Sequence, residues 1–183
     1  CNFIGMTSTN CHSNAREGVT SAKFSRFVSL PFQPSRLSIY ISVKWFEEVL
    51  LDIISQDKIK GILIDTDGTL GPHHTLGFES SILNHVQAIL QHGLKVAIYT
   101  NAAEDRFQIF KELGVKMVNN VPPKSDSSEF EIAMNEFLEL PDPSKICMIG
   151  DNYITDEGAI DAGMLFIYIE HDSTKTPRQC WLA

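Results

Sequence analysis

Short apolar runs alternate with segments of helical periodicity through most of the chain, and this alternation constrains the fold more than any other feature. The apolar runs are predicted to be strands over residues 59–64, 94–99, 115–118, 145–149 and 164–169. The periodic segments are predicted to be helices over residues 43–54, 79–91, 104–113, 127–138 and 156–162. Strands that alternate with helices of this length form a parallel sheet with helices on both faces. We therefore predict an α/β fold in three layers around a five-stranded parallel sheet.

Charge divides the chain into two parts. Residues 1–44 carry five basic residues and one acid, a net charge of +4, whereas residues 45–183 carry ten basic and 22 acidic residues, a net charge of −12. The sum is −8 over 183 residues, a length that suits one α/β domain and is short for two. We expect a basic leader over residues 1–44 and the α/β domain over residues 45–183. The acidic balance argues against broad nucleic-acid binding, and no apolar run approaches the roughly 18 residues of a membrane span.

The composition of the leader is typical of a targeting sequence. Residues 1–44 hold 11 Ser or Thr residues and a single acid. A hydroxyl-rich, basic and acid-poor composition is found in mitochondrial and plastid transit peptides. A flexible tail on a cytoplasmic protein can have the same composition, so both locations stay open. The four cysteines are widely spaced, without a CxxC pair, and indicate a reducing compartment.

Polar residues gather where the predicted strands end. Asp65 follows the strand over residues 59–64, Thr100 follows the strand over 94–99, and Asp151 follows the strand over 145–149. Each of these residues alone would be an ordinary turn or helix cap. Open α/β sheets bind their ligands at the carboxyl ends of the strands, so their joint occurrence predicts a site there. The candidate site residues are Asp65, Thr66, Asp67, Thr100, Asn101, Arg106, Lys124, Asp151 and Asp156.

In order and spacing, these residues resemble the haloacid dehalogenase (HAD) superfamily of phosphohydrolases. The four motifs of that superfamily match Asp65-x-Asp67-Gly68-Thr69-Leu70, Thr100, Lys124 and Gly150-Asp151-x-x-x-x-Asp156. The resemblance covers roughly residues 59–169. It implies a Rossmann-like fold and a magnesium-dependent phosphatase that works through an aspartyl-phosphate.

The resemblance gives three of these residues a catalytic role. Asp65 would be the nucleophile, since a carboxylate can attack phosphorus when it is held in line and desolvated. Asp67 would protonate the leaving oxygen and later activate the water. Lys124 would pair with the phosphate and with Asp65.

The same resemblance implies a metal site. Mg²⁺ prefers oxygen ligands and would be bound by the Asp65 carboxylate, the Asp67 carbonyl and Asp151. Its charge would offset the repulsion between the phosphate and these carboxylates. Asp156 would support either the metal site or Lys124.

Other residues would hold the substrate. The Thr66 amide, the Thr100 hydroxyl and the Asn101 amide would bind phosphate oxygens. Thr100 to Arg106 also has the spacing of a Ser-Asn-Asn-x-x-x-Arg segment in the phosphatidylglycerophosphate phosphatase branch of the superfamily. In that comparison Arg106 would contact a second phosphate, and an exposed arginine on a helix face is the alternative.

The distances between the motifs leave no room for a cap domain. Only 29 residues, 71–99, separate Leu70 from Thr100, and a helix and a strand take up most of them. The 22 residues between Asn101 and Lys124 are filled in the same way. A site without a cap suits a large substrate, such as a lipid headgroup at a membrane surface or a protein side chain. Oligomerisation could close the site instead.

Two other classes of protein also fit part of the pattern. A signalling receiver domain places a phosphoacceptor Asp, a Thr and a Lys around a parallel sheet, but its metal-binding acids come before the phosphoacceptor. Here the additional acids, Asp151 and Asp156, come late in the chain. The other class is a non-catalytic binding module, and the intact Asp65, Asp67 and Lys124 count against it.

Overall fold

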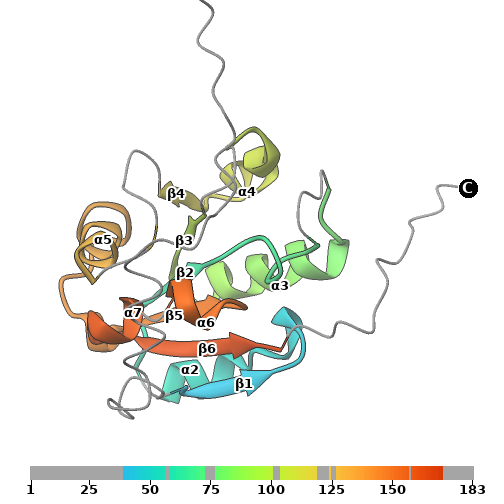
Figure 1. The fold of residues 1–183 in the computed structure, drawn as a ribbon. Helices are drawn as coiled ribbons and strands as arrows, with labels where there is room; N and C mark the ends of the chain where they lie inside the picture. Colours follow the sequence, from blue (N-terminus) through green and yellow to red (C-terminus); the bar gives the residue numbers. More distant parts are fainter. Residues whose placement is uncertain are drawn as a thin grey trace, which may run out of the picture.

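A six-stranded parallel sheet forms the centre of the protein (Figure 1). The structure is a computed structural model, and it describes residues 39–56, 58–72, 77–100, 104–118, 124, 127–156 and 158–170. The strand order is β1-β6-β5-β2-β3-β4, and every pair is parallel. The strands are β1 (Ile41–Val43), β2 (Gly61–Ile64), β3 (Lys95–Tyr99), β4 (Lys116–Val118), β5 (Ile146–Gly150) and β6 (Leu165–Ile169). The predicted α/β class and parallel sheet are confirmed.

The sheet has one strand more than the five we predicted, because residues assigned to the leader form β1. Ile41 pairs with Ile167 and Val43 with Ile169. The Glu170 amide donates to the Val43 carbonyl, which extends the pairing beyond the strand. A three-residue edge strand has no detectable period, and its partner lies more than 100 residues away in the sequence. Residues 1–38 of the expected leader lie outside the described part of the chain.

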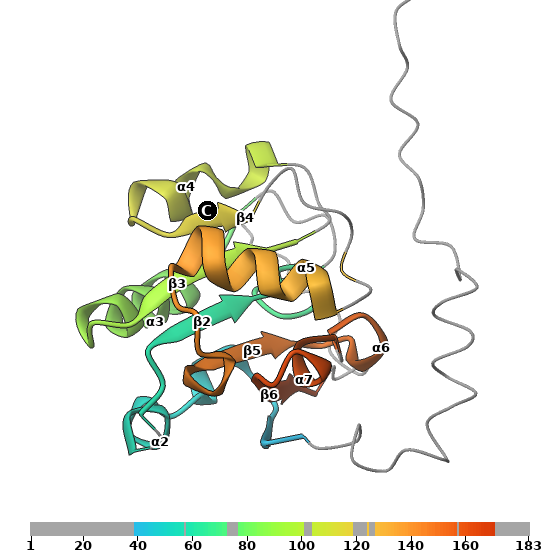
Figure 2. The same ribbon diagram turned by 90° about the vertical axis from the view of Figure 1, so that its left-hand side faces the viewer.

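Helices cover both faces of the sheet and make three layers (Figure 2). One face is covered by η3, α2, α3, η4 and α4, and the other mainly by α5, η5 and α7. Their bounds are η3 (Phe46–Glu48), α2 (Leu51–Gln56), α3 (Ser80–Gln91), η4 (Glu104–Phe107), α4 (Gln108–Glu112), α5 (Ser127–Ile132), η5 (Ala133–Leu138), η6 (Pro143–Lys145), α6 (Tyr153–Asp156) and α7 (Gly158–Asp161). The helix predicted over residues 127–138 ends in the π-helical segment η5. The helix predicted over residues 156–162 is α7, and α6 precedes it.

Side chains from β2 are buried on both faces of the sheet, as expected for a central parallel strand. Ile62 and Ile64 pack into the core under α3, whereas Leu63 packs into the core under α5. All three side chains are fully buried. This alternation explains why the strand reads in the sequence as one continuous apolar run.

The order of the strands places a crevice beside β2. From β2 the chain continues to β3 and β4 on one side, and then returns to β5 on the other side. Ligand sites of open α/β sheets lie at such a reversal, outside the carboxyl ends of the strands. Ile64 of β2 pairs with Ile149 of β5, so Asp65 and Asp151 follow neighbouring strand ends.

The connections around this crevice are short where the structure describes them. Residues 77–99 hold only α3 and β3, and residues 104–118 hold only η4, α4 and β4. This agrees with a domain without a cap at either position. None of the helices among the described residues is both long and apolar enough to span a bilayer.

Candidate active site

The loop after β2 is fixed by backbone hydrogen bonds that begin at Asp65. The Asp65 amide donates to the Ile149 carbonyl at 2.9 Å, so this residue still follows the line of the sheet. The chain then turns sharply, and the Thr66 carbonyl accepts from the amides of Thr69 and Leu70 at 3.2 and 2.9 Å. Asp65 therefore has a fixed backbone at the end of a buried strand, while the residues after it form a tight turn.

Gly68 is required in this turn for two reasons. Its φ of +88° lies in the left-handed region that favours glycine. A Cβ at this position would also collide with the carboxylate of Asp151. The turn after β2 and the loop after β5 thus approach each other closely, and this brings Asp151 to the site.

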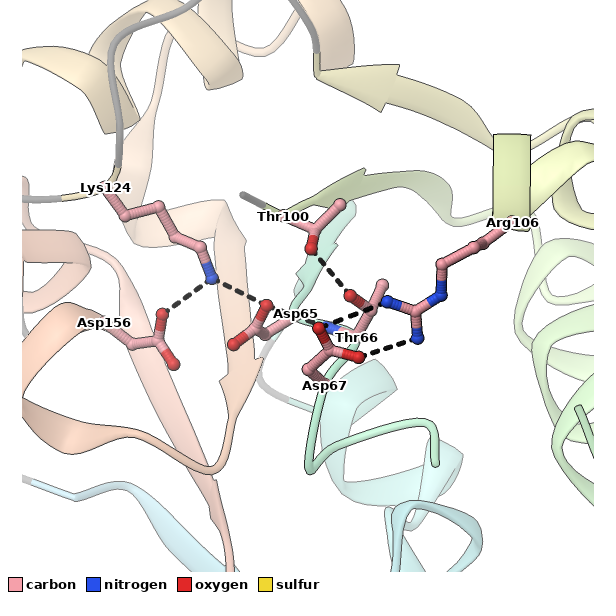
Figure 3. Close-up of polar contacts among 7 residues, drawn as sticks. All are labelled: Asp65, Thr66, Asp67, Thr100, Arg106, Lys124 and Asp156. Carbon is pink, nitrogen blue, oxygen red and sulfur yellow. Dashed lines mark hydrogen bonds and ion pairs between the residues drawn. The ribbon is translucent and has the colours of Figure 1, made fainter. Parts of the chain in front are cut away.

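Lys124 joins two of the acids in a buried ion cluster (Figure 3). Its Nζ lies 2.9 Å from Asp65 Oδ1 and 2.9 Å from Asp156 Oδ1. The side chains of Lys124 and Asp156 are 2% and 0% exposed, whereas that of Asp65 is 13% exposed. Asp65 is therefore the member of this cluster that reaches solvent.

Burial and charge act against each other on this cluster. Burial alone would lower the pKa of Lys124, but the carboxylates of Asp156 and Asp65 outweigh burial and raise that pKa above its usual value. Burial raises the pKa of Asp156, with Lys124 opposing and Asp65 adding to the rise. Lys124 thus stays protonated. Of the two buried charges, the carboxylate of Asp156 costs more free energy to keep ionised. Asp156 Oδ2 is buried without a hydrogen-bond partner.

An aromatic ring supports the ammonium group from a further side. Lys124 Nζ lies 5.6 Å from the centroid of the Tyr99 ring, within the range of a cation–π interaction. Tyr99 is the last residue of β3, is 2% exposed and packs edge-on against Phe130. The sequence does not single out Tyr99, which is one aromatic residue at the end of an apolar run.

Two threonines lie next to Asp65. The Thr66 hydroxyl and the Thr100 hydroxyl are 2.7 Å apart, and the Thr66 amide lies 2.8 Å from Asp65 Oδ1. Thr66 is buried and Thr100 is partly exposed at the end of β3. The structure thus brings together the two predicted threonines, while Asn101 lies outside the described residues.

Arg106 forms a two-point ion pair with Asp67. Its Nη2 donates to Asp67 Oδ1 at 2.7 Å and its Nη1 to Asp67 Oδ2 at 3.3 Å. The two side chains are 11% and 21% exposed. Arg106 comes from η4 and approaches the aspartates from the side opposite Lys124 (Figure 3). The sequence predicts either a substrate contact or an exposed arginine on a helix face for Arg106, and nothing in it indicates the contact with Asp67.

The charges of the site fit a divalent cation. Asp65, Asp67, Asp151 and Asp156 carry four negative charges against two positive charges on Lys124 and Arg106, a formal excess of −2. Within the described residues, no three side chains of His, Cys, Asp or Glu converge as a metal-binding group. The expected donors are two carboxylates and a backbone carbonyl, a set that does not need a third side chain. The carboxylate of Asp156 forms an ion pair with Lys124. This contact agrees with the second of the two roles expected for Asp156.

Comparison with known proteins finds limited similarity. No protein-family profile and no curated protein sequence matches the chain. A solved structure of a protein from Listeria monocytogenes serotype 4b is 19% identical, with a TM-score of 0.49 over 67% of this chain and 88% of its own.

Two other similar structures are phosphatases by name. One, assigned as a 3-deoxy-D-manno-octulosonate 8-phosphate phosphatase from Vibrio cholerae, is 21% identical, with a TM-score of 0.48 over 62% of this chain and 67% of its own. The deoxy-D-mannose-octulosonate 8-phosphate phosphatase of Haemophilus influenzae, solved in a cobalt-bound form, is 19% identical, with a TM-score of 0.45 over 61% and 69%. TM-scores below 0.5 do not assign this chain to a family, so its function has to be argued from the site.

Proposed function

We propose that the protein is a magnesium-dependent phosphomonoester hydrolase that forms an aspartyl-phosphate on Asp65. The observation that carries this proposal is the buried Lys124 between Asp65 and Asp156, with only Asp65 facing solvent. A carboxylate at the open end of a parallel sheet, oriented by a buried cation, is positioned for nucleophilic attack. The superfamily resemblance of the four motifs supports the same reaction.

The first step would use one oxygen of Asp65 as the nucleophile. Lys124 Nζ and the Thr66 amide both contact Oδ1 of Asp65. We therefore expect the other oxygen, Oδ2, to attack phosphorus. The new Oδ2–P bond forms as the bond between phosphorus and the leaving oxygen breaks, and the leaving oxygen takes a proton from Asp67. The hydroxyls of Thr66 and Thr100 share one hydrogen bond, so the hydroxyl that accepts in it can donate its own proton to an oxygen of the transferred phosphoryl group.

The second step would release phosphate. A water gives its proton to Asp67 and attacks phosphorus, the bond to Asp65 Oδ2 breaks, and Asp65 returns as a carboxylate. Mg²⁺, held by the Asp65 carboxylate, the Asp67 carbonyl and Asp151, would supply positive charge to the phosphoryl oxygens. Lys124 would keep Asp65 in place through both steps.

The open site and the segment from Thr100 to Arg106 favour a large substrate, and we propose a lipid phosphomonoester such as phosphatidylglycerophosphate. Other phosphomonoesters, large or small, are the alternative substrates. A receiver-type domain or a non-catalytic binding module is the alternative class of protein. The protein would act at a mitochondrial or plastid membrane if the part of the expected leader before β1 is a transit peptide, and in the cytoplasm if it is not.

Phosphate release tests this proposal. The protein is assayed with phosphatidylglycerophosphate in mixed micelles, sugar phosphates, nucleotides and phosphopeptides, each with Mg²⁺ and with EDTA. We expect Mg²⁺-dependent release that is lost in Asp65→Asn. Full activity of Asp65→Asn would exclude the aspartyl-phosphate. A long-lived phosphorylated Asp65 without turnover would favour the receiver domain, and Mg²⁺ binding without turnover on the whole panel would favour the binding module.

A further inference from the structure

Asp67 combines a fixed backbone with a side chain that reaches solvent. It lies in the tight turn after β2, where it forms an isolated β-bridge with Gly71, and its side chain is 21% exposed. A partly exposed side chain changes rotamer within nanoseconds unless another group holds it. A carboxyl group that transfers a proton has to point at the reacting oxygen. The proposed role of Asp67 therefore requires a group that holds its carboxylate.

Arg106 contacts both oxygens of that carboxylate. Its Nη2 donates to Asp67 Oδ1 at 2.7 Å and its Nη1 donates to Oδ2 at 3.3 Å. A single contact would fix only the direction of the side chain, whereas two contacts with a planar guanidinium also fix the plane of the carboxylate. Arg106 therefore restricts both side-chain torsions of Asp67.

The guanidinium of Arg106 is itself supported by the core. Its carbon Cζ lies 5.2 Å from the centroid of the ring of Phe107, the next residue of η4. Phe107 is fully buried, and the centroid of its ring lies 5.9 Å from that of Phe78. Packed aromatic rings thus determine where the guanidinium lies. The Asp67 carboxylate is oriented against a rigid part of the domain.

The ion pair leaves Asp67 able to transfer a proton. Each carboxyl oxygen has two lone pairs, so an oxygen that accepts from Arg106 keeps a second position for a proton. The contact of Oδ2 is the longer of the two, and we therefore expect Oδ2 to carry the proton. The pair of Arg106 and Asp67 can thus persist through the whole catalytic cycle.

We propose that Arg106 is a positioning residue: it holds the carboxylate of Asp67 in the single orientation from which Asp67 transfers protons. This inference rests on the proposed phosphatase function and adds a residue to its mechanism. It gives Arg106 a task that needs no contact with the substrate. Figure 3 shows the two cations in parallel roles, with Lys124 on the nucleophile Asp65 and Arg106 on Asp67.

NMR tests the orientation of Asp67 directly. The three-bond couplings from Asp67 Cγ to its backbone nitrogen and carbonyl carbon report the first side-chain torsion. We expect the values of one staggered rotamer in wild type and averaged values in Arg106→Gln. Lys111→Gln, which removes an exposed cation from the neighbouring helix α4, should keep the wild-type values. The measurement requires neither substrate nor turnover.

Two matched esters, assayed with Mg²⁺, test the consequence for catalysis. 4-Nitrobenzyl phosphate releases an alkoxide that has to be protonated as it leaves, whereas 4-nitrophenyl phosphate releases a phenolate that leaves without a proton. The quotient kcat/KM covers only the steps up to the departure of the leaving group. In Arg106→Gln we expect kcat/KM to fall about tenfold or more for the nitrobenzyl ester and to stay within about threefold for the nitrophenyl ester. The loss of a positive charge acts on both phosphates alike, so the difference between the esters isolates the positioning role.

Further variants show whether Arg106 acts through Asp67. Asp67→Asn removes the proton donor, so adding Arg106→Gln to it should change kcat/KM for the nitrobenzyl ester by less than about twofold. Arg106→Lys keeps the positive charge but not the two-point contact, and we expect it to lose nearly as much as Arg106→Gln. Lys111→Gln should keep the wild-type kcat/KM for both esters.

The results separate this inference from the proposed function. Averaged couplings in wild type, unaveraged couplings in Arg106→Gln, equal losses on the two esters, or a further loss in the Asp67→Asn background overturns the positioning role and leaves the phosphatase function in place. Absence of turnover in wild type, on these esters and on the substrate panel above, overturns the proposed function and the proton transfer by Asp67 with it. Couplings that average only in Arg106→Gln would then support the orientation of Asp67 alone.

Discussion

Replacing Lys124 with Met tests the central ion cluster. The side chain of Lys124 is 2% exposed and that of Asp156 is fully buried, and the ammonium lies 2.9 Å from an oxygen of Asp156 and of Asp65. Lys124→Met leaves the Asp156 carboxylate buried without a counter-ion and near a second carboxylate. Removing one partner of a buried pair costs about 3–5 kcal/mol of unfolding free energy. We expect a loss of that size at pH 8, measured by urea denaturation with far-UV circular dichroism.

The loss of unfolding free energy in Lys124→Met should be larger at pH 8 than at pH 5. Burial raises the pKa of Asp156 in the folded protein above its unfolded value of 3.8, so the folded state binds more protons and stability falls as pH rises between the two pKa values. Without Lys124 the folded pKa is raised further. At pH 5 Asp156 is then protonated in the variant, and we expect the loss to shrink to about 1–2 kcal/mol.

Two companion variants make this prediction specific. Lys124→Met/Asp156→Asn removes both buried charges and should recover at least half of the loss at pH 8. Lys111→Met, on the exposed face of α4, should stay within about 0.5 kcal/mol of wild type. A loss below about 1 kcal/mol at pH 8, or an equal loss at pH 5 and pH 8, would refute the reasoning.

Three further predictions concern the surroundings of the cluster. Gly68→Ala forces a left-handed φ on alanine and places its Cβ on the Asp151 carboxylate, so we expect a loss of at least about 1–2 kcal/mol in urea denaturation and weaker Mg²⁺ binding by calorimetry. Tyr99→Phe keeps the ring beside Lys124 and should keep activity within about threefold, whereas Tyr99→Leu should lose about tenfold in kcat; equal activities would exclude the cation–π contact. Burial raises the pKa of the Cys147 thiol to about 12, so iodoacetamide should leave Cys147 unlabelled at pH 8 until urea unfolds the protein, as read by peptide mass mapping.

The strands that carry the site could be predicted because burial on both faces leaves a plain signal. β2 and β5 are buried at every position and read as continuous apolar runs. β1 gave no such signal, since its burial pattern is mixed and it exists only by pairing with β6, far along the chain. Tertiary pairing, rather than local propensity, makes these three residues a strand.

The positions of the site residues followed from the strand ends. The family resemblance added the pairing of Lys124 with Asp65 and gave Lys124 as one of two roles for Asp156, and both contacts are present. The pairing of Asp67 with Arg106, 39 residues apart, was not expected. Periodicity describes which face of an element a residue occupies, and it carries no information on which distant side chain will share that space. The structure was therefore needed to assign Arg106 to Asp67.

Burial distinguishes the two cations of the site. Lys124 lies between carboxylates with almost no access to solvent, and breaking such a pair leaves a buried charge without a partner to compensate its desolvation. The pair of Arg106 and Asp67 is more exposed, at 11% and 21%, so water reaches it and separating its charges costs less free energy. A pair that is costly to separate is suited to holding a nucleophile in one orientation through many turnovers. Lys124 thus holds Asp65 more firmly than Arg106 holds Asp67.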